Sequence, residues 1–108
     1  MNPMQPSTCA DAAPFALRVI DDSMEPEFRR HCIVIIDPTG HARDGSYVLA
    51  EIEGETIFRR LRMDGDRVWL EALKDIYPAL ALDAGITAVK GVVVQRAGTR
   101  RSYHKRYD

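Results

Sequence analysis

The sequence predicts a mostly β domain, built as a sandwich or half-open barrel of short strands. Short runs of apolar and β-branched residues recur along the chain, and Asp-Gly or Glu-Gly pairs separate several of them. Few stretches show the apolar spacing of a helix. The 108 residues are 45% apolar and 29% charged, which suits one globular domain. We expect it to span residues 15–97, between an extended arm (1–14) and a basic C-terminal tail (98–108).

The first half of the domain is expected to hold two strands joined by a turn. The run at residues 15–20 is short, apolar and suited to a strand. Asp22 and Ser23 interrupt it, and both residue types are good N-caps for one or two helical turns over residues 24–30. Residues 32–36 are a continuous, mostly β-branched run, which predicts a strand buried on both faces.

The second half is expected to consist of hairpins and a final strand. Three strand-like runs are separated by Glu-Gly and Asp-Gly pairs, at residues 47–52, 56–61 and 67–70. Such pairs between apolar runs are a hairpin signal. Residues 72–84 are irregular, and residues 86–95 contain three consecutive valines, which favours a closing strand.

Composition excludes several classes of protein. The formal net charge of −1 rules out a polybasic or polyacidic chain. Apolar runs stay well below the roughly 18–20 residues of a membrane span, and the first residues lack the pattern of a secretory signal. Cys9 and Cys32 make no disulfide framework, and the Cys and His residues lack the paired spacing of zinc sites. We expect a cytoplasmic protein without cofactor, metal or membrane contact.

Positive charge is concentrated near the C-terminus. Residues 96–108 carry five cations and one carboxylate, whereas the rest of the chain has a net charge of −5. Such a segment can contact nucleic acid or an acidic partner, but we favour a solvated, frayed chain end. Tyr103 and Tyr107 lie among the cations, as in some nucleic-acid binders. The candidate contact residues are Arg96, Arg100, Arg101, Lys105 and Arg106.

Ser23 is the leading candidate for chemistry. Its place after a strand and before a helical turn brings the hydroxyl near free backbone N–H groups, which can stabilise an oxyanion. A serine needs a base to become a nucleophile. Local features alone favour a plain N-cap serine, so the assignment depends on what else the sequence matches.

The sequence around Ser23 resembles the peptidase domain of LexA-type proteins. These include the self-cleaving repressors and the mutagenesis protein UmuD, and their domain is related to bacterial signal peptidase. The resemblance is carried by Asp-Ser-Met-Glu-Pro at residues 22–26, the buried run ending in Ile-Asp-Pro at 36–38, and the Asp-Gly pair at 44–45. It covers roughly residues 15–95. It implies a half-open β domain with one helical turn after the Ser-Met pair, and a role as a hydrolase in transcription regulation and the SOS response.

The resemblance also implies a catalytic pair that this chain has lost in part. In the family, a lysine on the second strand of the central hairpin activates the serine. Ser23 matches the nucleophile position, whereas Arg59 stands at the lysine position within residues 58–61, which read Phe-Arg-Arg-Leu. A neutral lysine can accept a proton, but arginine titrates above 12 and stays charged. None of the chain's three lysines lies in this hairpin. Arg59 can instead pair with Ser23 or with a carboxylate such as Asp22.

Two further departures from the family lie near the site. Asp21 replaces the glycine that is customary there, and residues 1–20 lack the small-residue bond at which the repressors cut themselves. Asp22 and Met24 remain cleft or oxyanion candidates beside Ser23. We expect a stand-alone, non-catalytic regulatory or protein-interaction domain, homodimeric, with a peptide or protein partner in the Ser23 cleft. Two alternatives stay open: an active serine (auto)peptidase, and a nucleic-acid-associated regulator that uses the basic tail, with DNA as a possible partner.

Overall fold

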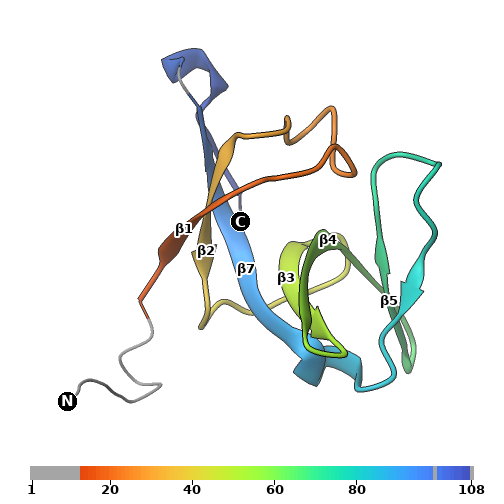
Figure 1. Cartoon of the computed structure of the whole chain (residues 1–108). Helices are drawn as coiled ribbons and strands as arrows, with labels where there is room; N and C mark the ends of the chain where they lie inside the picture. Colours follow the sequence, from red (N-terminus) through yellow and green to blue (C-terminus); the bar gives the residue numbers. More distant parts are fainter. Residues whose placement is uncertain (1–12, 99, 108) are drawn as a thin grey trace.

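The protein is built around one eight-stranded antiparallel sheet. The structure is a computed structural model that describes residues 13–98 and 100–107. The strand order is β1-β2-β7-β3-β4-β5-β6, and β8 pairs with β7. The long strand β7 runs between β1 and β2 on one side and β3, β4 and β5 on the other (Figure 1). The predicted mostly β fold class is confirmed. The expected N-terminal arm lies almost wholly outside the described residues.

The strands follow the predicted order closely. They are β1 (Phe15–Arg18), β2 (Ile33–Asp37), β3 (Tyr47–Ile52), β4 (Glu55–Asp64), β5 (Arg67–Glu71), β6 (Leu80–Ala81), β7 (Val89–Ala97) and β8 (Lys105–Arg106). Both predicted hairpins form, because β3 pairs with β4 and β4 with β5. Gly54 and Gly65 have positive φ angles in the two turns, a conformation that glycine adopts without a Cβ clash.

Three segments differ in secondary structure from the sequence expectations. The segment after Ser23 is a series of turns and not a helix, although Phe28 N–H donates to the Met24 carbonyl at 2.9 Å as in one α-turn. Pro26 disfavours helical backbone angles at the preceding Glu25, which favours turns over a helix here, and the turns place Met24 and Phe28 in the core. The short helix η2 (Gly85–Ala88) occupies the residues where the last strand was expected to begin, so β7 begins at Val89. Strand β6 lies within the segment that was expected to be irregular.

Strand β2 is buried on one face only, which corrects the prediction of burial on both. Val34 and Ile36 are fully buried, whereas Ile33 and Ile35 are partly exposed. Alternating burial of this kind is typical of an antiparallel sheet that has one face against the core. Val34 and Ile36 join a core cluster with Met24 and Phe28, so β2 and the turn after Ser23 are packed together.

The C-terminal segment is folded onto the sheet, and the expectation of a frayed end is wrong for residues 100–107. After the short helix η3 (Arg101–Tyr103), strand β8 pairs with β7. Tyr107 N–H donates to the Val94 carbonyl at 2.9 Å, and its hydroxyl donates to Glu27 at 2.6 Å. Its ring packs against Phe28 and Tyr47. Aromatic side chains therefore anchor the basic segment to the turn that follows Ser23.

Candidate functional site

Ser23 lies in the turn between β1 and β2 and is fully buried. Its carbonyl oxygen accepts hydrogen bonds from the backbone N–H groups of Leu73 and Lys74, at 2.9 and 3.2 Å. The turn is thereby tied to the segment that follows β5. Tertiary contacts hold the serine in place, and the residue is 0% exposed in this arrangement.

Arg59 reaches Ser23 from strand β4. Its Nη1 donates to the Ser23 hydroxyl oxygen at 2.8 Å and to its neighbour's carbonyl, that of Phe58, at 2.8 Å. The same nitrogen lies 3.9 Å from an Asp21 carboxylate oxygen, and the side chain is only 14% exposed. The guanidinium also lies 5.5 Å from the centre of the Tyr77 ring. The structure thus brings Ser23 and Arg59 together, and the arginine points at the hydroxyl.

Asp21 completes the surroundings of Ser23. The Ser23 hydroxyl donates to Asp21 Oδ1 at 2.8 Å, and the Ser23 backbone N–H donates to the same oxygen at 3.1 Å. The Ser23 backbone N–H could donate to an oxyanion, but here it already donates to the Asp21 carboxylate. From the sequence, Asp21 was identified only as a replacement for the family's customary glycine. An aspartate that accepts from the N–H two residues later is a common turn arrangement, and this was the available signal.

The arrangement satisfies the Ser23 hydroxyl without offering a strong base. The oxygen accepts from a guanidinium that has no lone pair to take a proton. Its proton is directed at the Asp21 carboxylate, and carboxylates are far weaker bases than a neutral amine. The geometry therefore stabilises a neutral serine between two opposite charges.

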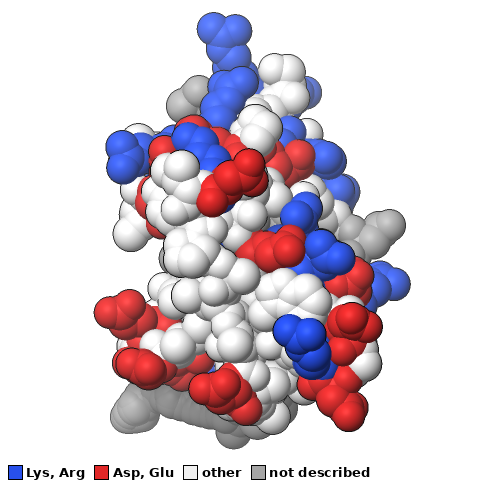
Figure 2. Space-filling view, turned by 90° about the vertical axis from the view of Figure 1, so that its right-hand side faces the viewer, with Lys and Arg blue, Asp and Glu red and all other residues white. Residues whose placement is uncertain are grey.

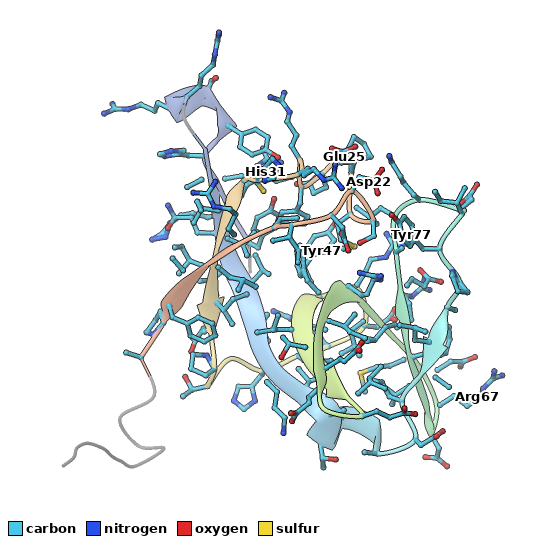
Figure 3. All side chains as sticks on the ribbon, viewed as in Figure 1. Asp22, Glu25, His31, Tyr47, Arg67 and Tyr77 are labelled. Carbon is cyan, nitrogen blue, oxygen red and sulfur yellow. The ribbon has the colours of Figure 1, made fainter. Side chains whose placement is uncertain are left out.

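Asp22 is bound to the segment after β5 and does not contact Arg59 in the described contacts. Lys74 Nζ donates to Asp22 Oδ2 at 2.8 Å, and the Tyr77 hydroxyl donates to Oδ1 at 2.5 Å. The hydrogen bond from Lys74, followed by that from Tyr77, lowers the pKa of Asp22 to about 2. Asp22, Glu25 and Tyr77 lie at the same end of the molecule (Figure 3).

Lys74 is unsuited to act as a general base for Ser23. It lies 2.8 Å from Asp22 and 3.3 Å from Glu25. The hydrogen bond to Asp22 raises the pKa of Lys74, although partial burial opposes this, and a second hydrogen bond to Glu25 adds to it. A general base needs a lowered pKa, so the two carboxylates act in the wrong direction.

Comparison with known proteins decides the family. The model of the Peptidase S24-like family matches residues 2–94. The chain belongs to this family. The resemblance to LexA-type peptidase domains is therefore confirmed, and the turn with Ser23 and strand β4 with Arg59 are parts of an S24-like domain.

Repressors and transcriptional regulators are among the curated relatives of this S24-like chain. It is 35% identical over 88 residues to the HTH-type transcriptional regulator for conjugative element R391 of Providencia rettgeri, covering 75% of this chain and 40% of the relative. It is 34% identical over 99 residues to the prophage repressor CohE of Escherichia coli K12, covering 89% and 44%. Repressor protein C2 of Salmonella phage P22 is 38% identical over 64 residues, covering 57% and 29%. The chain thus spans less than half of these relatives.

The other residues that were predicted to line the cleft or to contact a partner are partly buried, partly paired and partly exposed. Met24 was expected to line the cleft, but its side chain is fully buried in the core. Arg96 and Lys105 both contact Glu27, at 3.1 and 2.9 Å. Arg100, Arg101 and Arg106 are exposed. One carboxylate on the Ser23 turn therefore binds two of the five cations.

No helix in the described part of the chain is long and apolar enough to cross a membrane. Within the same residues, no group of three or more His, Cys, Asp or Glu side chains could hold a metal ion.

Replacing Ser23 by alanine is expected to lower the free energy of unfolding by about 1–3 kcal/mol. An N-cap serine would cost about 1 kcal/mol, but here the lost hydroxyl is buried and bridges Asp21 and Arg59. Urea denaturation monitored by Trp69 fluorescence measures the loss. Ser46→Ala, at a partly exposed serine, is the control. A Ser23→Ala loss no larger than that of the control would contradict the bridging role.

Asp22 is expected to make stability depend on acid pH. Its pKa falls from 3.8 to about 2 in the folded protein, so its stabilising contribution is present above pH 3.8 and is lost as the pH falls towards 2. Urea midpoints of the wild type and Asp22→Asn, measured from pH 6 to pH 2, should differ at pH 6 and converge at pH 2. A constant difference across this range would show that ionisation of Asp22 is not what stabilises the turn.

Proposed function

We propose that this chain is a regulatory S24-like domain that does not cleave peptide bonds. One observation carries the proposal: the group that contacts the Ser23 hydroxyl from β4 is the Arg59 guanidinium, at 2.8 Å. The family resemblance assigns the position of the catalytic lysine to this residue. The Asp21 carboxylate adds support, since it binds the Ser23 N–H and hydroxyl that a reacting peptide would need. In this proposal the polar contacts among Ser23, Asp21 and Arg59 hold the β1–β2 turn against β4.

The relatives support a regulatory role for this domain. Their names describe transcriptional regulators and repressors, and the similarity covers most of this chain. We infer that the domain acts in transcription regulation by binding a protein partner and not by hydrolysis. The homodimer, and a peptide or protein partner beside the Ser23 turn, remain predictions.

Reactivity of Ser23 tests the proposal directly. The purified chain is incubated with a fluorophosphonate probe from pH 7 to pH 10, and intact mass spectrometry records both adducts and truncated products. We expect no adduct at Ser23 and no truncation, so that the wild type and Ser23→Ala give the same spectra. A reactive serine hydrolase in a parallel tube shows that the probe is competent. Labelling or self-cleavage of the wild type that Ser23→Ala abolishes would overturn the proposal.

A further inference from the structure

A basic pocket lies beside the Ser23 turn, between the loop that enters β2 and the C-terminal segment. Its volume is about 600 Å³, the size of a site for a small ligand or a few side chains. Several Lys and Arg side chains lie at the upper end of the molecule in Figure 2, with Asp and Glu side chains among them. The described lining residues are Arg29, Arg30, His31, Cys32, Gly98, Arg100, Ser102 and Tyr103.

The pocket has positive charge that nothing in its walls neutralises. Three arginines line it, and no carboxylate does so among the described lining residues. Two nearby carboxylates on the same turn are not among the lining residues and have other partners: Glu25 accepts from the Arg30 backbone N–H and contacts Lys74, and Glu27 binds the C-terminal segment. In the described part of the chain, the three guanidinium groups of the pocket take part in no salt bridge.

Neighbouring groups hold two of these arginines in position. The Arg29 guanidinium stacks over the Tyr103 ring at 4.9 Å, and the Tyr103 hydroxyl accepts from the Arg29 backbone N–H at 2.8 Å. Arg30 donates through Nε to the Ile20 carbonyl at 3.2 Å, which leaves its terminal nitrogens available. Guanidinium groups held in this way lose less side-chain entropy when they bind an anion.

We propose that this pocket binds the carboxylate side chains of an acidic segment in a partner protein. The planar fork of arginine matches a carboxylate, and three such groups around one hollow fit several acids close together in sequence. A nucleic acid fits less well, because the Tyr103 ring already stacks with Arg29 and with Arg96 and is not available to a base. The pocket uses neither Ser23 nor Arg59, so the outcome of the probe experiment does not affect it.

Fluorescence anisotropy with a fluorescein-labelled hexaglutamate peptide tests this proposal. At 50 mM salt the wild type should bind the peptide, and Arg29→Gln/Arg100→Gln should bind it about tenfold more weakly or worse, because two charge-assisted contacts are lost. The control Arg43→Gln/Arg67→Gln removes the same charge from two exposed arginines that do not line the pocket, and should change the affinity less than about twofold. In Figure 3 the labelled Arg67 lies far from His31 in the pocket wall.

Two additions keep the test decisive. Arg100→Gln alone changes an exposed residue and should weaken binding about threefold or more, even where the double variant folds poorly. A fluorescein-labelled 12-base-pair DNA duplex is titrated in parallel. The proposal is overturned by absence of peptide binding, by equal losses in the pocket and control variants, or by tighter binding of the duplex that the pocket variant abolishes.

Discussion

Replacing Arg59 by lysine should raise the rate at which a fluorophosphonate labels Ser23 by about 10²- to 10⁴-fold, the usual contribution of a general base. The arginine side chain is 14% exposed and already reaches the hydroxyl, so a lysine from the same strand position would lie beside it. Burial lowers the pKa of a lysine, which makes its neutral form accessible. The labelling rate should rise with pH, because only the neutral amine accepts the proton.

Asp21 is expected to limit this gain. Its carboxylate holds both the Ser23 N–H and the hydroxyl proton. In Arg59→Lys it would also attract the new ammonium group and keep it charged. Adding Asp21→Gly releases both donors of Ser23, so the double variant should label faster than Arg59→Lys alone.

Arg60→Lys is the matched control for this gain. It makes the same substitution one residue along β4, where the side chain pairs with Glu71 at 2.8 Å. Ser23→Ala in the Arg59→Lys background should abolish labelling. If Arg59→Lys and its Asp21→Gly double variant label no faster than Arg60→Lys, then β4 is wrongly matched to the family's lysine strand.

Replacing Phe28 by alanine should lower the free energy of unfolding by about 3–5 kcal/mol, as is usual when a buried aromatic ring is removed. Phe28 is fully buried, and its ring centre lies 4.8 Å from that of Tyr47, 5.1 Å from that of Phe58 and 5.4 Å from that of Tyr107. These partners come from β3, from β4 and from the C-terminal segment. Urea denaturation followed by circular dichroism measures the loss.

Ile76→Ala is the control for the size of this effect. Ile76 is a large apolar residue that is 79% exposed, and its truncation should change stability by less than about 0.5 kcal/mol. Tyr107→Phe removes the hydroxyl that binds Glu27 but keeps the ring, so it should cost less than Phe28→Ala. A loss below about 1 kcal/mol for Phe28→Ala would show that the ring does not join the Ser23 turn to the core.

Local patterns predicted the strands well where alternation and turn residues agreed. Strand β3 at Tyr47–Ile52 and both hairpin turns match the expectation, because Gly54 and Gly65 supply the backbone conformation that the turns require. The helical turns after Ser23 were predicted from N-cap residues and from the family resemblance. Pro26 disfavours helical backbone angles at the preceding Glu25, so the segment forms turns, and these turns bury Met24 and Phe28.

The sequence by itself determined the fold class, the S24-like character and the chemistry at position 59, because a side chain without a lone pair is no base wherever it lies. The family resemblance offered Ser23 as one partner for Arg59, 36 residues away, and Asp22 as another, and only the tertiary structure decided between them. Lys105 and Glu27 are 78 residues apart, and no local pattern indicates their contact. The Asp21 oxygen that binds Ser23 is close in sequence, but its orientation depends on a turn whose path the buried core determines.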